Sequence, residues 1–363
     1  MVRARPSTRN PRSTFVAAAG VALCVTSAAA AAGDPVIGYW TEANVVVADE
    51  TGAHVRTLPD FYRFSFGGGL LAGQREGKQR GSDRVIAYDL AGGERAFEIR
   101  NATNPVVPAT GDRVVFLPTY RRDPYARSVW VRTPGGKVRK VAQFRSRGVP
   151  GIPHGMGGDG GPLEMALDHS GRYAAVVFGL ESLRAFDVWV VDTKTREATR
   201  MTRGENSHNP SLSPDAEHLA VRVERPEGCP DPLYGEILVG KVRVVSRDTG
   251  AHRDLTEFGC DVFYDTPRWI DDETLVAVRA TKDASEEYGY DLDLVRMDAA
   301  SGTITELLTE GNPCCVTSSP SLGRIAFGFS DRPGFAMLDL ESGEVVDFEG
   351  QVYVPHLSGE GRS

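Results

Sequence analysis

The chain has 363 residues, of which 41% are hydrophobic and 25% charged, and its formal net charge is −8. These proportions are typical of a globular protein with a large core, and they exclude a disordered or fibrous chain. The acidic balance argues against nucleic acid or an anionic lipid surface as the main partner.

Residues 1–32 have the pattern of a secretory signal. A basic segment with four arginines precedes an apolar run, Phe15–Thr26, and then the small residues Ala28–Ala32. We expect cleavage after Ala32 and export of the mature chain, which would be secreted, periplasmic or associated with the cell envelope. The alternative is a retained membrane anchor, although the apolar run is short and rich in alanine for that purpose. No transmembrane span is expected in the mature chain.

A hairpin pattern recurs seven times along the rest of the chain. In each copy a short apolar run leads into a turn that contains Asp, Gly or both, and most copies continue into a second short run. The turns begin at Asp49, Asp89, Arg132, Asp192, Asp248, Asp298 and Asp339. An Asp side chain caps such a turn and Gly supplies the positive φ. Copies about 40 to 60 residues apart predict the four-stranded blades of a β-propeller.

The fold class predicted is therefore all-β, a propeller of four-stranded blades in one domain over residues 33–357, with a disordered tail at 358–363. Six blades are complete between about Tyr62 and Phe348. We expect a seventh blade in which Gln351–Pro355 forms the innermost strand and Val36–Leu58 supplies the other three. Mixing the two termini closes the ring and removes exposed strand edges. A six-bladed ring with loose ends is the alternative.

One stretch resembles the TolB-type propeller repeat. It contains Asp187-Val-Trp-Val-Val-Asp192, Met201-Thr202, Pro210-Ser-Leu-Ser-Pro-Asp215 and Leu219-Ala-Val221. The resemblance is strong over 187–221, fair to about residue 348, and implies a fold without specifying an activity. The chain departs from TolB in two ways: TolB has six blades, and it carries an α/β domain before its propeller. The partners of TolB are therefore not expected to carry over.

Four cysteines remain after residue 32, and an even number in an exported chain suggests disulfides. Cys229, Cys260 and the pair Cys314-Cys315 all fall in loops on one face of adjacent blades. Cys229–Cys260 is the favoured pairing, which would leave Cys314–Cys315 as a vicinal disulfide. Alternatively, Cys260 pairs with one of those two residues. The spacing lacks a Cys-x-x-Cys element, and no metal site is predicted.

The longest insertion, Arg145–Pro162, is rich in glycine and lies on that same face, where it could carry binding residues. His154 and Asp159 are its only side chains with obvious chemistry. His208 stands at a blade entrance near the channel, where it could bind a ligand together with Glu205. The plainer interpretation is that the insertion is a flexible surface loop and that His208 is a solvated loop residue.

The leading functional hypothesis is a non-enzymatic binding scaffold for a protein, a small molecule or a carbohydrate. The alternative is a propeller enzyme, a polysaccharide lyase or hydrolase, that uses His154 or His208 at the channel mouth. The chain has no Gly-x-Ser-x-Gly elbow and no His-Glu-x-x-His motif. No catalytic residue and no cofactor is assigned, nucleic acid is not expected as a partner, and the protein is expected to be a monomer.

Overall fold

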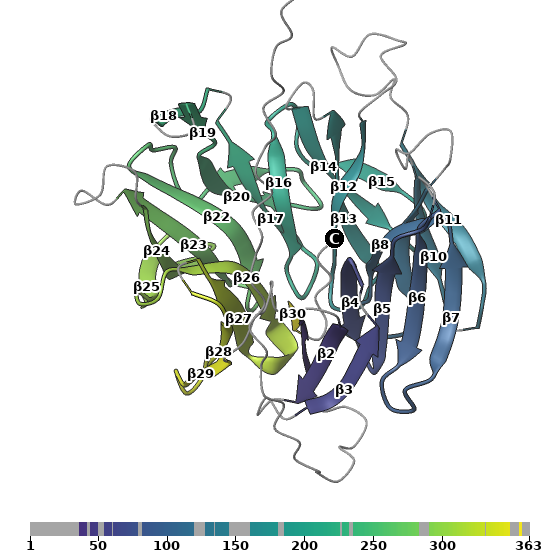
Figure 1. Cartoon of the computed structure of the whole chain (residues 1–363). Coiled ribbons are helices and arrows are strands. Elements are labelled where there is room, and N and C mark those ends of the chain that lie inside the picture. Colours follow the sequence, from purple (N-terminus) through teal and green to yellow (C-terminus); the bar gives the residue numbers. More distant parts are fainter. Residues whose placement is uncertain are drawn as a thin grey trace, which may run out of the picture.

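Seven antiparallel sheets of four strands each are arranged in a ring (Figure 1). This computed structural model describes residues 36–41, 44–49, 54–59, 61–78, 82–119, 128–133, 135–144, 160–180, 185–225, 227–231, 235–282, 290–330, 332–348 and 356–357. The prediction of a β-propeller is confirmed, with seven blades and not six. Within the described ranges no helix is long and apolar enough to cross a membrane.

Each of blades two to seven is built from consecutive strands, and blade one combines both ends of the chain. The strands of blades one to four are β1 (Val36–Trp40), β2 (Asn44–Asp49), β3 (His54–Pro59), β4 (Arg63–Gly67), β5 (Leu70–Arg75), β6 (Arg84–Asp89), β7 (Arg95–Arg100), β8 (Ala102–Val106), β9 (Val114–Pro118), β10 (Ser128–Arg132), β11 (Val138–Gln143), β12 (Gly160–Leu167), β13 (Tyr173–Leu180), β14 (Ala185–Asp192) and β15 (Ala198–Arg200).

Blades five to seven follow in the same way, except that blade five carries a small extra hairpin. The strands are β16 (Ser207–Leu212), β17 (His218–Glu224), the hairpin β18 (Cys229–Asp231) and β19 (Gly235–Ile237), β20 (Gly240–Ser246), β21 (His252–Asp254), β22 (Val262–Trp269), β23 (Thr274–Lys282), β24 (Tyr290–Asp298), β25 (Ile304–Leu308), β26 (Pro313–Ser319), β27 (Arg324–Phe329), β28 (Phe335–Asp339), β29 (Val345–Phe348) and the closing strand β30 (His356–Leu357). One 3₁₀ turn, η3 (Pro320–Leu322), follows β26.

The turn chemistry of the hairpins is the one that the sequence predicts. Asp339 Oδ1 accepts the N–H groups of Glu341 at 3.1 Å and Ser342 at 2.9 Å. Gly343 takes a φ of 72°, which favours glycine. The bond from the Ser342 backbone, more than any other contact, lowers the pKa of Asp339 to about 2. Asp89, Asp192 and Asp298 accept turn N–H groups in the same way, as proposed from the recurrence of these aspartates, whereas Asp248 accepts from the Arg247 side chain instead.

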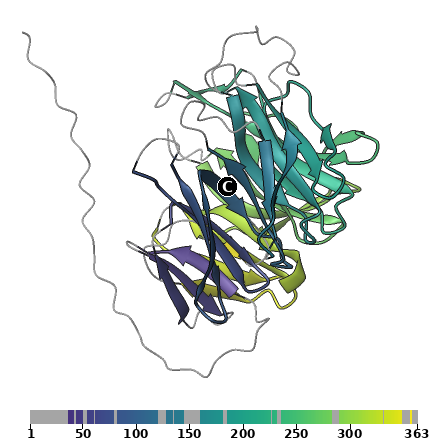
Figure 2. The same cartoon turned by 90° about the vertical axis from the view of Figure 1, so that its right-hand side faces the viewer.

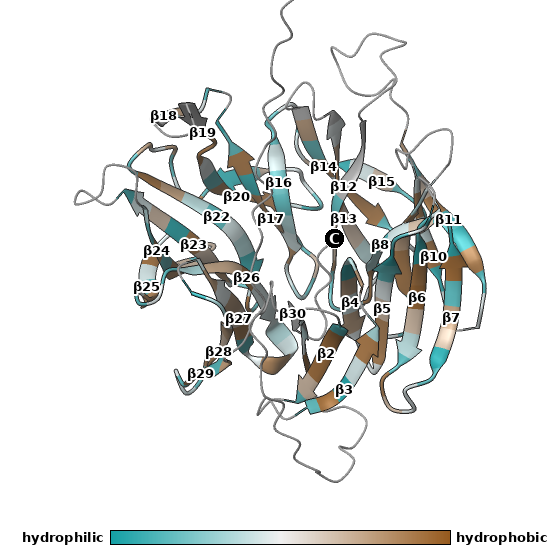
Figure 3. Cartoon of the chain, in the orientation of Figure 1, coloured by the Kyte–Doolittle hydropathy of each residue, from teal (hydrophilic) through white to brown (hydrophobic). Residues whose placement is uncertain are grey.

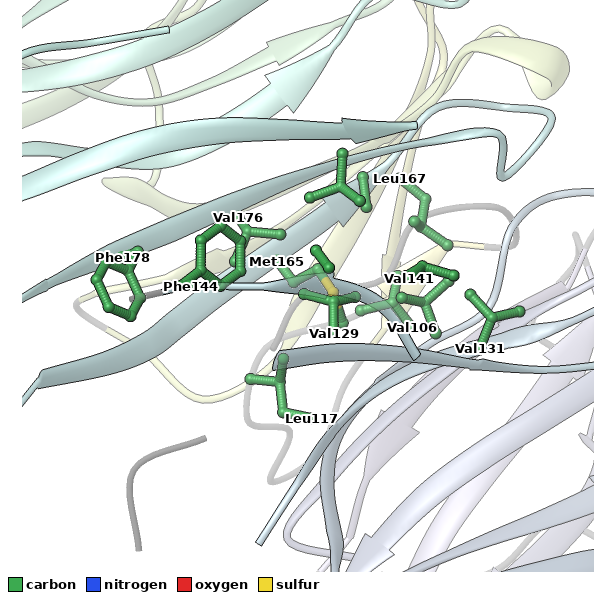
Figure 4. Close-up of a cluster of buried hydrophobic side chains, with 14 residues drawn as sticks. Val106, Leu117, Val129, Val131, Val141, Phe144, Met165, Leu167, Val176 and Phe178 are labelled. Atoms are coloured by element: carbon green, nitrogen blue, oxygen red, sulfur yellow. The ribbon is translucent and has the colours of Figure 1, made fainter. Parts of the chain in front are cut away.

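The core lies between neighbouring blades, because each sheet is apolar on both faces. Between blades three and four, buried side chains from β8 to β11 interdigitate with those of β12 to β14 (Figure 4). Hydrophobic stretches run along strands such as β2 and β10 (Figure 3). A blade alone would leave these faces in water, so only the closed ring buries them.

The ring is closed where β30 pairs with β1, through Ile37↔Leu357 and Gly38↔His356. In Figure 2 the purple strands of blade one accordingly lie near the yellow strands of blade seven. The C-terminal strand was predicted at Gln351–Pro355, which lies outside the described residues, and the observed pairing is made by His356–Leu357. Residues 1–32 and 358–363 also lie outside them.

Two inner strands begin earlier than the sequence suggests. β12 begins at Gly160 and not at Leu163, so the end of the predicted insertion Arg145–Pro162 belongs to the sheet. β16 begins at Ser207, which places His208 within a strand. Each innermost strand starts on the same side of the ring, and we call that side the entry face.

Candidate functional site at the mouth of the central channel

Five of the seven inner strands have a bulge close to the entry face. The register shifts in β8, β12, β16, β22 and β26. In four of these bulges a residue other than glycine has a positive φ, with values of 49°, 50°, 47° and 54° for Asn104, Asn209, Thr266 and Cys315. For β-branched Thr266 this is an uncommon, strained conformation, and such strain is concentrated at functional sites.

The bulges release backbone N–H groups from the sheet, and side chains accept their hydrogen bonds. The Asn209 N–H donates to Glu164 Oε2 at 2.6 Å. The Asn209 side-chain amide Nδ2 donates to Asp265 Oδ1 at 2.9 Å. Since Glu164 belongs to blade four and Asp265 to blade six, Asn209 of blade five joins carboxylates from the two neighbouring blades.

His208 lies between two carboxylates. Its Nδ1 is 3.7 Å from Glu164 Oε1, and its Nε2 is 3.7 Å from Glu224 Oε2. Its Nε2 also lies 3.3 Å from Asn206 Oδ1. The ring packs on Phe186 with centroids 4.5 Å apart. The imidazole is thus held in place on both sides and is only 15% exposed.

An arginine completes the cluster. Arg222 Nη1 lies 3.0 Å from Glu224 Oε1 and 3.5 Å from Asp265 Oδ2. Its Nη2 donates to the carbonyl oxygen of Leu238 at 2.9 Å. The Asn206 side chain also donates to Glu224, at 2.5 Å. We call Glu164, His208, Asn209, Arg222, Glu224 and Asp265 the mouth cluster.

The three carboxylates of the mouth cluster differ in exposure. The Glu224 side chain is 8% exposed, whereas those of Glu164 and Asp265 are 30% and 35% exposed. Burial raises the pKa of Glu164, but electrostatic attraction to the neighbouring His208 and the hydrogen bond from the Asn209 N–H outweigh it and hold that pKa below its usual value. Glu164 and Asp265 are therefore the charges that a ligand would meet first.

Of the predicted site residues, the structure places only one, His208, in the mouth cluster. His154 and Asp159 lie outside the described residues. His208 is part of the mouth cluster, but its neighbours are Glu164 and Glu224. The carboxylate of Glu205 instead lies 2.5 Å from Nη1 of Arg243. Among the described residues no group of three or more His, Cys, Asp or Glu side chains is arranged to hold a metal ion.

Sequence reasoning missed Glu164, Glu224 and Asp265. One signal could have found the last of these, because Thr103-Asn-Pro105, His208-Asn-Pro210 and Asp265-Thr-Pro267 occupy the same position in their blades. In each, the residue two before the proline is the last one paired before the bulge. Glu164 and Glu224 have no comparable motif.

The predicted disulfide Cys229–Cys260 is present. Its Cα atoms are 5.5 Å apart, within the usual range. It joins the hairpin β18–β19 to the segment between β21 and β22, which are loops of the entry face. Since Cys260 is bonded to Cys229, the alternative pairing of Cys260 with Cys314 or Cys315 is excluded. Both of those residues are half-buried in β26, and their vicinal pairing stays a prediction.

Apart from the mouth cluster, a recess opens on the entry face at blade six. It has a volume of about 540 Å³, and its lining includes Arg279, Asp291, Asp293, Glu306 and Asn312. The Arg279 guanidinium lies 2.7 Å from Asp293 and 2.9 Å from Glu306. Two of its three carboxylates are therefore already paired.

No protein-family model and no curated protein matches the chain. Solved structures do match. The tricorn protease aligns with a TM-score of 0.61 and 13% identity over 90% of this chain and 34% of that one. An oligogalacturonate lyase in complex with manganese aligns with a TM-score of 0.57 and 14% identity, covering 86% of this chain and 84% of that one. A putative TolB from Agrobacterium tumefaciens aligns with a TM-score of 0.46 and 14% identity, covering 74% of this chain and 91% of that one.

At these identities the likeness concerns the fold alone, and the chain spans about a third of the tricorn protease's length. The TolB-like propeller suspected from the repeat is confirmed as a fold by the blades themselves. The solved neighbours include a lyase and a protease, so propellers of this kind serve more than one chemistry.

Proposed function

We propose that the protein is an exported, non-enzymatic binding protein that holds its ligand at the mouth cluster. The observation that carries this proposal is the junction at Asn209, which fixes partly exposed carboxylates of blades four and six at one place. Rigid strands position both carboxylates, and such preorganisation favours binding. Because Glu164 and Asp265 only accept hydrogen bonds when ionised, the ligand should offer donors, such as the hydroxyl groups of a carbohydrate or the cationic side chains of a protein.

Export and the single domain over 33–357 belong to the same proposal. The disulfide supports export, because disulfides persist mainly in oxidising compartments. Peptide mapping of the exported protein checks both cleavage after Ala32 and the Cys229–Cys260 bond. Cysteines found reduced in the mature protein would contradict the assignment to an oxidising compartment.

The experiment compares capture by the mature protein with capture by Glu164→Gln/Asp265→Asn, which removes both charges and preserves side-chain size. The exported fraction is passed over each immobilised protein, and the retained proteins and glycans are identified by mass spectrometry. Glu205→Gln is the matched control, because Glu205 lies on the same face but pairs with Arg243. Loss of the same ligand from the double variant alone supports the proposal, and equal capture by all three contradicts it.

One observation favours the alternative, a polysaccharide lyase or hydrolase. An imidazole between two carboxylates has the groups that acid–base catalysis needs. However, each of these groups already contacts a neighbour in the cluster, whereas catalysis requires them to converge on a substrate. Incubation with plant and bacterial polysaccharides, followed by assay of reducing ends and of unsaturated products, distinguishes an enzyme from a non-enzymatic binding protein. Turnover that is lost in His208→Gln would establish the enzyme.

A further inference from the structure

Three arginines lie directly opposite one another across three strands of blade two. The register pairs Arg75 of β5 with Arg84 of β6, and Arg84 with Arg100 of β7. We call these three residues the arginine row. All three are exposed and lie at the ends of their strands on the entry face.

Like charges directly opposite each other destabilise a sheet. One carboxylate partly offsets the repulsion here, because Glu98 lies 3.6 Å from Arg84 and 3.7 Å from Arg100. Arg95 also pairs with Glu98. Within the described part of the chain no other carboxylate lies within ion-pair distance of these arginines, and Arg75 has none. The row therefore keeps a net positive charge on a protein whose net charge is −8.

The geometry of the row suits a chain of anionic groups. Neighbouring strands are ~4.8 Å apart, so the three arginines leave the sheet at about that interval. This interval is close to the length that one sugar residue adds to a linear polysaccharide. Arginine binds carboxylates through two parallel hydrogen bonds, which selects planar oxyanions over a diffuse negative surface.

An exposed aromatic ring stands at the inner end of the row. Tyr62 directly precedes β4, and its N–H donates to the Gln74 carbonyl oxygen at 2.9 Å, beside Arg75. Its side chain is among the few large hydrophobic ones in the described residues that remain exposed, at 70%. The Arg63 guanidinium lies over this ring, 5.6 Å from its centroid, and the aromatic surface that stays exposed can stack on the C–H face of a sugar ring. Phosphate chains or acidic peptides offer no such partner along their backbone.

We propose that the arginine row and Tyr62 form a binding site for an acidic oligosaccharide that carries carboxylates on consecutive sugar rings. The site is separate from the mouth cluster and does not depend on its proposed function. The row is retained at a cost in sheet stability because the ligand's carboxylates relieve the repulsion. Functional sites commonly show this exchange of stability for binding.

The test titrates the mature protein with a linear oligogalacturonate in a calorimeter at low salt, with the fully methyl-esterified oligomer as the uncharged match. We expect binding of the acidic oligomer and at least tenfold weaker binding of the ester. Arg84→Gln should weaken binding about tenfold or more, because one charge-assisted contact is lost. The melting temperature of Arg84→Gln should equal or exceed that of the wild type, which shows that weaker binding results from the lost contact and not from unfolding.

Arg253→Gln is the matched control, since Arg253 is an exposed arginine of β21 in blade five. It should bind like the wild type. Tyr62→Ala should weaken binding of the oligogalacturonate without affecting tripolyphosphate, which is the second probe. Unchanged binding in Arg84→Gln, or equal affinity for the methyl ester, overturns the proposal. Tighter binding of tripolyphosphate or polyglutamate than of the oligogalacturonate overturns the assignment to carbohydrate.

Discussion

The mouth cluster and the arginine row lie on the same face of the propeller but treat charge in opposite ways. In the mouth cluster each carboxylate has a partner from a neighbouring strand or blade, and Arg222 alone contacts two of them. In the arginine row like charges are aligned by strand register, and only Arg84 and Arg100 share a carboxylate, that of Glu98. The first arrangement stabilises the ring, whereas the second is explained by what it can bind. Charge content alone would not distinguish them.

The largest effect on stability is expected from the disulfide on the same face as the mouth cluster. Replacing both Cys229 and Cys260 with serine should lower the free energy of unfolding by about 3 to 4 kcal/mol, because the bond closes a loop with a sequence separation of 31 residues. Urea denaturation of wild type and variant under oxidising conditions measures this. If reductant lowers the wild-type stability by a similar amount, the disulfide accounts for the loss.

The next effect tests the paired state of the mouth cluster. Glu224→Ala removes the partner that Arg222, His208 and Asn206 share, and it should cost about 2 to 3 kcal/mol because a buried cation loses compensation. Asp265 keeps part of the attraction to Arg222, so the full penalty is not expected. Glu205→Ala is the control and should cost less, because Arg243 keeps its two hydrogen bonds to Asp254. Equal losses in the two variants would show that the cluster is no more coupled than the Glu205–Arg243 pair.

A smaller effect is expected in the dependence of stability on pH, on the acid side. The pKa of Glu164 is lower in the folded state than in the unfolded chain. Its stabilising contribution is therefore full above the unfolded value of about 4.3 and is lost as the pH falls through the folded pKa. Thermal melts should show wild type above Glu164→Gln near pH 6, with the two curves converging at acid pH. A difference that grows as the pH falls would contradict the sign.

The smallest effect on stability is expected in the arginine row, where the substitution should stabilise the protein and not destabilise it. Arg84→Gln removes the central charge of three, so the free energy of unfolding should rise by a few tenths of a kcal/mol at low salt. Added salt should reduce the gain, because it screens the repulsion in the wild type. Differential scanning calorimetry at two ionic strengths measures both. A clear loss of stability would mean that Arg84 is structural, and the contrast between the two regions would fail.

The sequence by itself determined the architecture and one covalent link. Turn-capping aspartates, short apolar runs and a blade-length spacing are local signals, so seven blades and their hairpins followed from them. The topology that those signals define favoured the pairing of Cys229 with Cys260, and the structure excluded the alternative pairing of Cys260 with Cys314 or Cys315. His208 was recognised as a residue near the channel because it precedes the proline of an inner strand.

Only the tertiary structure decided which charges meet. Glu164, His208 and Asp265 are far apart in the chain. Each lies at a bulge of its own inner strand, and the three come together around Asn209. The arginine row depends on register, because a shift of one residue would move Arg84 to the other face of its sheet. Register is set by cross-strand packing over the whole blade, and no local pattern around Arg75, Arg84 or Arg100 reveals it.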